Sequence, residues 1–291
     1  MRRLNVLALA LACLLAPSPT VAQRPESLRA PATSGASVPP AATAAAAANV
    51  TVDHSAYDAL LRRHVVNGEV DYAAFAREPS FARYLASLDR VDPTTLDDEE
   101  RLAFWINVYN AFTIQLVAQS GETSTIRNIT KTLGVLRLKG PWSAPIVRAA
   151  GRTLSLDDVQ HTILRKQFNE PRIHFAIVYA AKSSPPLRSE AYRGAGLESQ
   201  LVDQGRRFLR ESWESNRLER VGRRRLLMLS PVFSYYRKDF AATRADLGRF
   251  LAPWFEGEDR EALEKGTFMT QPTTFDWALN GVGSRTVAPA K

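Results

Sequence analysis

The sequence is poor in cysteine. Its single cysteine, Cys13, lies within an N-terminal segment that we expect to be removed, so the mature chain would contain none. A chain without cysteine forms no disulfide, offers no thiol nucleophile and binds no cysteine-ligated zinc or iron–sulfur cluster. The N-terminal apolar run, residues 4–15, is too short to cross a bilayer.

A glycine-rich phosphate loop is also missing from the sequence. Residues 194–196, Gly-Ala-Gly, come nearest to one, and they lack the rest of both the dinucleotide-binding and the P-loop patterns. No segment of about 20–50 residues repeats, which argues against a solenoid or a propeller. We therefore expect neither a nucleotide-binding loop nor a repeat architecture.

The chain carries an excess of positive charge. Its net charge is +8 at neutral pH and falls to +6 once Arg2 and Arg3 are removed. Apart from residues 206–207 and 223–225, the basic residues are scattered along the sequence. A scattered excess is typical of a solvated basic surface, whereas nucleic-acid binding needs a concentrated patch. We expect no nucleic-acid partner.

The first 22 residues have the pattern of a secretory signal peptide. Arg2 and Arg3 precede the apolar run, and small residues ending at Ala22 precede Gln23. The pattern predicts cleavage after Ala22 and a periplasmic or secreted location. A retained N-terminal anchor and a lipoprotein modified at Cys13 are the less favoured alternatives.

Composition divides the rest of the chain into three parts. Residues 23–49 are rich in alanine and proline and cannot bury enough apolar surface to fold, so we predict a disordered linker. Residues 50–283 have the mixed composition of one folded domain, with ample length for a core. Residues 284–291 form a short tail.

The stretch 101–119 organises the domain, because its apolar residues occupy all sides of a helix. Such a helix is buried either in a globular core or in a membrane, and Asn107, Asn110 and Gln115 argue against a membrane. The two asparagines are three positions apart and share one face. We expect both amides to be hydrogen-bonded, either fixing loops to the core or lining a site.

Periodicity and capping residues predict further elements. Ser155 and Asp158 form a capping box that starts a helix reaching about residue 168, and the β-branched and aromatic run 172–180 predicts a strand buried on both faces. The other predicted elements are helices at 57–65, 81–88, 197–213, 247–255 and 259–264, hairpins at 146–154 and 218–229, and a closing strand at 268–279. The predicted fold class is α+β: a mostly helical single domain around a small β-sheet.

Several motifs in this domain resemble those of the domain of unknown function 547 family. They are residues 104–111, 155–159 with His161, 172–176, 181–183 with 185–187, 229–230 with Tyr236 and residues 239–240, and 276–277 with 279–280. The resemblance covers roughly residues 54–280 in the same order. It implies a mostly bacterial, often exported domain and implies no established activity.

The chain departs from this family where chemistry would matter most. The resemblance implies cysteines at two positions that are occupied here by Tyr179 and Ser184, and an acid where Gln160 stands. A lost nucleophile would account for one missing cysteine, whereas a disulfide, a redox pair or a metal-binding pair would account for both. A pair lost together is the simpler explanation.

His174, at the start of the predicted strand, is the first candidate for a site. A histidine there is commonly a neutral, hydrogen-bonded core residue, and the functional alternative is a base that faces the following loop. In that loop Lys182 could accept the proton of Ser183 or Ser184 as a serine–lysine pair. The candidate catalytic residues are therefore His174, Lys182 and Ser184.

A second group of polar residues supplies candidates for binding. Its members are Asn107, Asn110, Asp276 and Asn280. Because rigid loops that leave buried strands favour functional groups, we predict one buried cluster around His174. Its expected partners are Asp276 and one of the two asparagines of the central helix.

Metal binding has one weak indication in the sequence. Asp157 and His161 are four positions apart on a predicted helix, a spacing compatible with two metal ligands. No third ligand stands at metal-binding spacing. We predict no metal and no cofactor.

Two classes of function follow. The preferred one is a non-catalytic binding or accessory module that uses a cleft beside the central helix; its partner would be a small molecule, a peptide or an envelope component. The alternative is a hydrolase or transferase that uses His174 with Ser184, Lys182 or an acidic residue. We predict no membrane span after signal removal, and the oligomeric state is left open.

Overall fold

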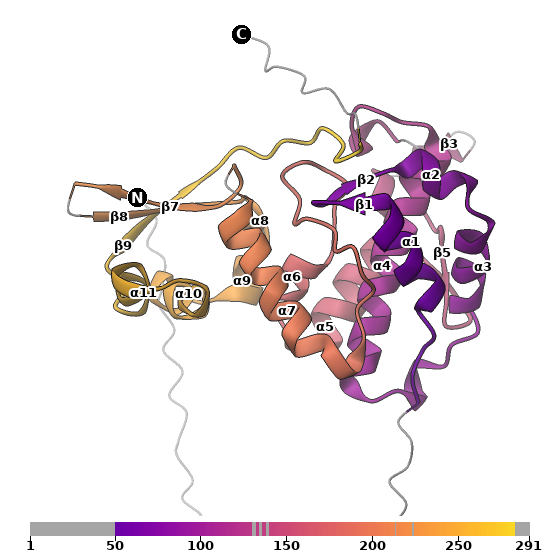
Figure 1. The fold of residues 1–291 in the computed structure, drawn as a ribbon, viewed down its shortest axis with the longest axis horizontal. Helices are drawn as coiled ribbons and strands as arrows, with labels where there is room; N and C mark the ends of the chain where they lie inside the picture. The colour runs from indigo at the N-terminus through magenta and orange to yellow at the C-terminus, as the bar shows by residue number, and fades with distance from the viewer. Residues whose placement is uncertain are drawn as a thin grey trace, which may run out of the picture. The chain divides into compact units, whose positions relative to one another are not determined.

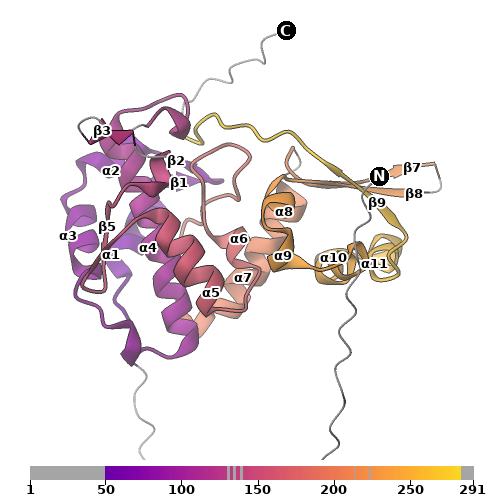
Figure 2. The same cartoon turned by 180° about the vertical axis from the view of Figure 1, so that it is seen from behind.

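The computed structural model describes residues 50–129, 132–133, 136–137, 140–212, 214–222 and 224–282. The predicted signal peptide, linker and C-terminal tail lie outside the described residues. Within the described part, helices and short sheets form a mostly helical α+β fold, as the sequence predicts (Figure 1 and Figure 2). None of the helices in this part combines the length and the apolarity that a bilayer crossing requires.

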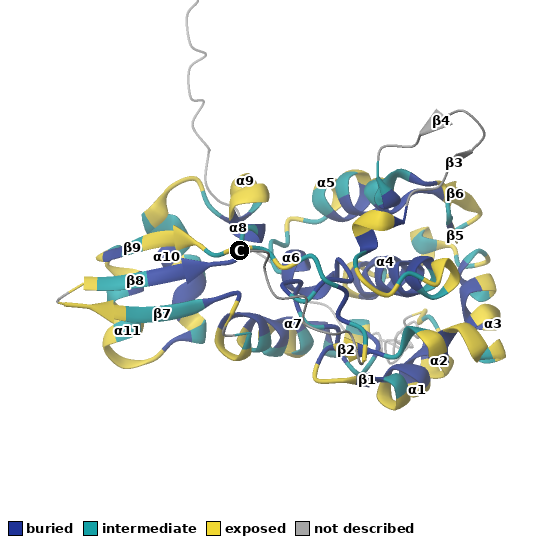
Figure 3. Cartoon of the chain, turned by 90° about the horizontal axis from the view of Figure 1, so that it is seen from above, coloured by how far each residue is buried: buried dark blue, intermediate teal, exposed yellow. Residues whose placement is uncertain are grey.

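The helix α4 (Asp98–Ser120) is the buried central helix that the sequence predicts. The Asp97 side chain caps it by accepting from the Glu100 backbone N–H, and Gly121 ends it with a φ of 68°, in the left-handed region. All residues from 102 to 117 except Gln115 are buried (Figure 3). The elements that cover it include α2 (Tyr72–Arg77), α3 (Pro79–Leu88), β5 (Val147–Ala149), η4 (Asp158–Leu164), η5 (Gly194–Gly196) and α7 (Leu197–Arg206).

A helix and a small hairpin precede α2. The helix α1 (Ser55–His64) leads into the antiparallel strands β1 (Val65–Val66) and β2 (Glu69–Val70). Gly68 in their turn has a φ of 84°, and a Cβ there would lie 2.7 Å from Pro186 Cβ. Glycine is therefore required both by the backbone and by this close approach. The 3₁₀ turn η1 (Pro93–Thr95) joins α3 to α4.

The predicted hairpin at 146–154 is confirmed. It consists of β5 and β6 (Arg152–Leu154), with Val147 opposite Leu154 and a turn at Ala150 and Gly151, both of which have positive φ. The elements between α4 and this hairpin are η2 (Ile126–Asn128), β3 (Thr132–Leu133), β4 (Leu136–Arg137) and η3 (Pro141–Ser143). They carry the chain from the end of α4 to the hairpin.

The predicted helix after Ser155 is present with an unexpected geometry. The Ser155 hydroxyl accepts from the Asp158 N–H at 3.0 Å, and the Asp158 carboxylate accepts from the Ser155 N–H at 2.9 Å, so the capping box is confirmed. Beyond the cap, η4 is a π-helix, and it continues into α5 (Arg165–Gln167). π-Helical turns are rare and occur frequently at functional sites.

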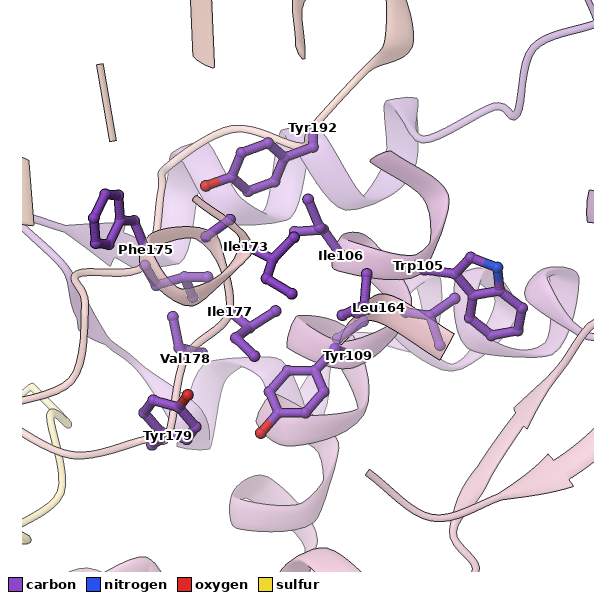
Figure 4. Packing of buried hydrophobic residues seen from close by; sticks show 14 of the residues in the cluster. Trp105, Ile106, Tyr109, Leu164, Ile173, Phe175, Ile177, Val178, Tyr179 and Tyr192 are labelled. Carbon is purple, nitrogen blue, oxygen red and sulfur yellow. The ribbon is translucent and has the colours of Figure 1, made fainter. Parts of the chain in front are cut away.

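The segment 172–180 is not the strand that its composition predicts. It begins as the short helix α6 (Ile173–Ala176) and continues as irregular buried chain. The Asn110 amide explains this, because its Nδ2 donates to the Ala176 carbonyl at 2.9 Å and its Oδ1 accepts from the Val178 N–H at 3.0 Å. A side chain thus satisfies backbone groups that a neighbouring strand would otherwise pair. Figure 4 shows side chains of this segment packed against those of α4.

The C-terminal part supplies a three-stranded sheet and short helices. The predicted hairpin at 218–229 is confirmed as β7 (Arg217–Val221) and β8 (Arg224–Leu229), and β9 (Phe268–Pro272) pairs with β8 in parallel. The closing strand predicted to reach residue 279 therefore ends earlier. The helical elements here are η6 (Arg207–Glu211), α8 (Val232–Tyr235), α9 (Arg237–Phe240), α10 (Arg244–Leu251), η7 (Ala252–Trp254) and α11 (Gly257–Glu264).

Candidate functional site

His174 is the fully buried end of a chain of polar side chains. Its side chain is 0% exposed, and its Nε2 lies 2.7 Å from Oδ2 of Asp239 on α9. The ring of Tyr236 stacks on the imidazole, with centroids 4.0 Å apart and planes 12° apart. Phe240 packs beside the imidazole at 5.2 Å. The imidazole is therefore enclosed by aromatic rings and by its carboxylate partner.

Asp239 connects His174 to two further residues. Arg165 donates to the Asp239 carboxylate through Nε at 2.5 Å and Nη2 at 2.8 Å, a bidentate pair. Nη1 of Arg165 lies 3.1 Å from Nδ1 of His161. The hydrogen bonds from Arg165 hold the pKa of Asp239 below its usual value, against the opposing effect of partial burial. We call His174, Asp239, Arg165 and His161 the His174 network.

The partners in this network let us infer the proton positions of both histidines. Arginine only donates, so Nδ1 of His161 accepts and its Nε2 carries the proton. An ionised Asp239 only accepts, so His174 carries its proton on Nε2. Nδ1 of His174 is then a buried acceptor without a partner among the described residues. Burial lowers the pKa of His174 to about 4, so the imidazole is neutral at pH 7.

Tyr236 also lines a pocket of about 170 Å³, which we call the aromatic pocket. Its lining residues are Trp142, Asp157, Gln160, His161, Tyr179, Val232, Tyr235, Tyr236, Phe275 and Trp277. Six of the ten are aromatic, so most of the wall is ring surface. The ring of Trp277 lies 4.4 Å from that of Phe275 and 6.0 Å from that of Trp142. Segments far apart in sequence thus meet in one aromatic wall.

The polar side of the pocket comes from one stretch of chain around η4. Gln160 donates to the Tyr179 hydroxyl at 3.1 Å, which orients that ring. Nε2 of His161 lies 3.9 Å from Oδ1 of Asp157, too far for a hydrogen bond. Burial raises the pKa of Asp157 and lowers that of His161. The pocket therefore presents a carboxylate acceptor and an imidazole N–H donor side by side.

Local sequence explains why these groups face the pocket. The capping box engages Asp158, which leaves the neighbouring Asp157 as the carboxylate that lines the pocket. The Arg165 N–H donates to the Gln160 carbonyl, five residues back, which is the bond that widens a π-helical turn. His161 and Arg165 therefore lie close enough to join the pocket to the His174 network.

The loop candidates do not pair with His174 through any bond that the structure shows. The Ser184 hydroxyl accepts from the Tyr179 N–H at 2.8 Å and donates to the Pro185 carbonyl at 3.1 Å. Lys182 and Ser184 line a separate hollow of about 400 Å³, in which His174 takes no part. The nearest carboxylate partner of His174 is Asp239 instead.

The binding candidates mostly hold backbone segments in place. Asn107 binds both the N–H and the carbonyl of Tyr192, at 3.0 and 2.8 Å. Asn110 does the same for the chain after α6. Asn280 accepts from the Tyr72 hydroxyl at 2.6 Å and donates to the Gly68 carbonyl at 3.0 Å. These amides hold neighbouring segments together by hydrogen bonds, and none of those bonds reaches the His174 side chain.

The expected cluster of His174 with Asp276 is not formed. The Asp276 carboxylate accepts from the Ala278 N–H at 2.8 Å, and its own N–H donates to the Ser183 hydroxyl at 2.8 Å. Asp276 thus holds residues 276–278 against the loop that contains Ser183. Asp239 takes the place that the prediction gave to Asp276.

Sequence reasoning missed Asp239, Arg165 and the tryptophans of the pocket. Asp239 had one signal, since an acidic residue between Tyr236 and Phe240 belongs to the motif that carries the family resemblance. Arg165 stands on the same helical stretch as His161, four positions later, which is the spacing of side-chain neighbours. Nothing in the sequence places Trp142 beside Trp277.

Among the described residues, no group of three histidine, cysteine, aspartate or glutamate side chains is arranged to hold a metal ion. Asp157 and His161 remain two groups without a third.

Comparison with known proteins gives one match. Residues 93–209 match the family model described as "Protein of unknown function, DUF547". That range contains α4, the His161 and His174 segments and α7. No curated protein and no solved structure matches the chain.

Proposed function

We propose that this chain, of which residues 93–209 match the DUF547 model, is an exported, non-catalytic module that binds a small ligand in the aromatic pocket. The observation that carries the proposal is the lining of the pocket. It combines six aromatic rings with a carboxylate and an imidazole N–H, and it includes no serine, threonine, cysteine or lysine among the described residues. Such walls of apolar surface with a few convergent polar groups are typical of ligand sites.

The environment of His174 supports a binding role over a catalytic one. A general base must come within hydrogen-bond reach of its substrate, yet His174 is fully buried beneath Tyr236 with its Nε2 bonded to Asp239. The Ser184 hydroxyl is likewise committed to two backbone groups. Both His174 and Ser184 are thus already engaged in hydrogen bonds within the fold, which supports the binding role over the hydrolase or transferase alternative.

One observation favours the catalytic alternative. His161 lines the pocket half-exposed, next to Asp157, and both have shifted pKa values, as acid–base groups often do. Without a side-chain nucleophile in the lining, such chemistry would have to activate water. We place the catalytic alternative second, because Asp157 and His161 serve ligand binding equally well.

Binding can be tested with a panel of neutral, anionic and cationic fragments, read by thermal melting and by ligand-observed NMR. We expect at least one class of fragment to bind, and Trp277→Ala to weaken its binding by about tenfold or more, because stacking area is lost. Val221→Ala, at an exposed apolar position outside the pocket, is the control and should leave binding unchanged. Fragments that bind both variants alike would place the site elsewhere and contradict the proposal.

We propose from the N-terminal sequence that the protein is exported. The partners of the exported protein would be small molecules, peptides or envelope components. The small residues before Gln23 predict that protein purified from the native envelope begins at Gln23. Intact-mass measurement checks this directly. A diacylated species that begins at Cys13, or an intact N-terminus at Met1, would contradict it.

A further inference from the structure

The aromatic pocket has an unbalanced electrostatic character. Of the described residues that line it, Asp157 is the one with a formal charge at neutral pH. His161 is the only other lining residue that could ionise near pH 7, and burial and the Arg165 charge lower its pKa. The wall as a whole is therefore negative and otherwise uncharged.

The charges just behind the wall largely cancel. Arg165 and Asp239 neutralise each other through their bidentate pair, and His174 is neutral because burial lowers its pKa. Asp158 adds a further negative charge, held by the capping box at Ser155. No positive charge in this group remains to balance Asp157, whose carboxylate is also partly withdrawn from water.

The aromatic rings supply a surface that attracts cations. The face of an aromatic ring carries negative partial charge, and a cation within about 6 Å of its centroid is stabilised. Two rings of this pocket already hold arginines in this way: Arg165 lies 5.0 Å from the Tyr236 centroid and Arg127 lies 5.5 Å from the Trp277 centroid. Arg127 is exposed outside the lining, so solvent and salt screen its repulsion of a bound cation.

From these contacts we propose that the pocket takes a small organic ammonium ion, with its cationic head between Asp157 and the rings of Trp277 and Tyr179. The proposal rests on the binding function proposed above and specifies its ligand. Nε2–H of His161, 3.9 Å from the Asp157 carboxylate, is placed to donate to an oxygen near the ammonium head. An amino alcohol such as choline has both groups. The volume of about 170 Å³ holds on the order of five water molecules at ~30 Å³ each, enough for such a head group.

The test compares choline with its neutral isostere, 3,3-dimethylbutan-1-ol, on the purified protein. Binding is measured by calorimetry and by the change in intrinsic tryptophan fluorescence, to which Trp142 and Trp277 of the pocket contribute. We expect choline to bind at least tenfold more tightly than the alcohol, because the two differ only in charge. Equal affinities for the two molecules would overturn the ammonium proposal.

Two matched variants separate the pocket charge from the general charge of the protein. Asp157→Asn should weaken choline binding about tenfold and leave the alcohol within twofold, since the amide keeps the shape and removes the charge. The Asp157 side chain is 44% exposed, so the variant should fold, as circular dichroism would verify. Glu99→Gln, which removes an exposed charge on α4 outside the pocket, should change neither affinity. Unchanged choline affinity in Asp157→Asn would overturn the proposal.

The outcome also distinguishes this inference from the proposed function. If neutral fragments bind and depend on Trp277 while choline and tetramethylammonium do not bind, the pocket is a ligand site and the ammonium proposal fails. If no fragment of any charge binds at the pocket, the proposed function fails and the ammonium proposal fails with it.

Discussion

Replacing Trp105 with alanine is expected to lower the free energy of unfolding by about 3–5 kcal/mol, the usual effect of emptying a large buried aromatic site. Trp105 is 3% exposed on α4 (Figure 4). Its ring meets that of Phe104 in an edge-to-face contact, with the ring centroids 5.0 Å apart. The surrounding helices and hairpin limit how far neighbours can collapse into the space. Urea denaturation at pH 7 measures the effect.

Trp277→Ala provides the matched control for this variant. The same atoms are removed, but Trp277 is only partly buried and lines a pocket that already contains space. We therefore expect a loss of stability clearly smaller than that of Trp105→Ala. If the Trp105 variant melts within a degree or two of the parent, α4 is not the core of the fold.

The central helix was predictable because its signal is local. An apolar residue on every side identifies a buried helix without any knowledge of its neighbours, and Asn107 and Asn110 were correctly expected to be buried and hydrogen-bonded. Capping at Ser155 and the turns of both hairpins are local signals as well. Each depends on residues within a few positions of one another, so the sequence alone contains it.

The segment 172–180 shows where local reasoning fails. Its β-branched and aromatic residues indicate burial on all sides, and such burial is typical of a strand inside a sheet. Its backbone groups are instead satisfied by Asn110, more than sixty positions earlier in the chain. No pattern within the segment distinguishes a neighbouring strand from a distant amide, since both leave the same apolar side chains.

The acid partner of His174 was misplaced for the same reason, on a larger scale. His174 and Asp239 are 65 positions apart, and Trp142 and Trp277 are further apart still. The sequence identifies His174 as a polar residue within an apolar run. It does not indicate which acidic side chain lies next to His174 in the fold. The spacing of His161 and Arg165 marks them as side-chain neighbours, but the π-helical geometry of their turn has no sequence signature that we could use.

The two positions at which the family resemblance implies cysteines are in direct contact. The Tyr179 N–H donates to the Ser184 hydroxyl at 2.8 Å. The bond joins the Tyr179 backbone to the Ser184 side chain, and the pairing of two cysteines at these positions stays a prediction. In this chain Tyr179 contributes a ring to the aromatic pocket, and Ser184 fixes the loop.

A second large effect is expected in mild acid, because two histidines are buried as neutral groups. Burial lowers the pKa values of His174 and His54 to about 4 each, from 6.5. Between pH 6.5 and 4 the unfolded chain binds protons at these positions and the folded chain does not, so the free energy of unfolding falls as the pH falls through this window. Each histidine contributes a loss of about 3 kcal/mol, at about 1.4 kcal/mol per pH unit.

Carboxylates act in a lower window and can be separated from the histidines. The hydrogen bonds from Arg165 lower the pKa of Asp239 below 3.8, so the stability that this carboxylate contributes is present above that value and is lost only as the pH falls further. A loss of stability between pH 6.5 and 4.5 therefore reports mainly on buried histidines. The free energy of unfolding of native proteins is about 5–15 kcal/mol, so the combined loss from the two histidines brings the protein near unfolding.

His174→Gln and His54→Gln divide this acid effect between the two sites. Each variant should lower the free energy of unfolding at pH 7, because packing and a hydrogen bond to Asp239 or Tyr84 are weakened. Each should also remove part of the loss measured by urea denaturation between pH 7 and 4.5, because glutamine does not titrate there. His161, whose pKa burial also lowers, accounts for a further part. A parallel pH dependence in the parent and in both variants would show that neither imidazole is the source.

His174→Gln also tests the role assigned to the His174 network. If the imidazole only supports Tyr236 and Asp239 from beneath the pocket, ligand affinity or turnover per folded molecule should stay within about twofold of the parent, even though the variant melts earlier. The effect on stability and the effect on function would then separate cleanly. A variant that keeps its melting temperature and loses its binding or turnover would instead make His174 a functional residue, in contact with whatever the pocket holds.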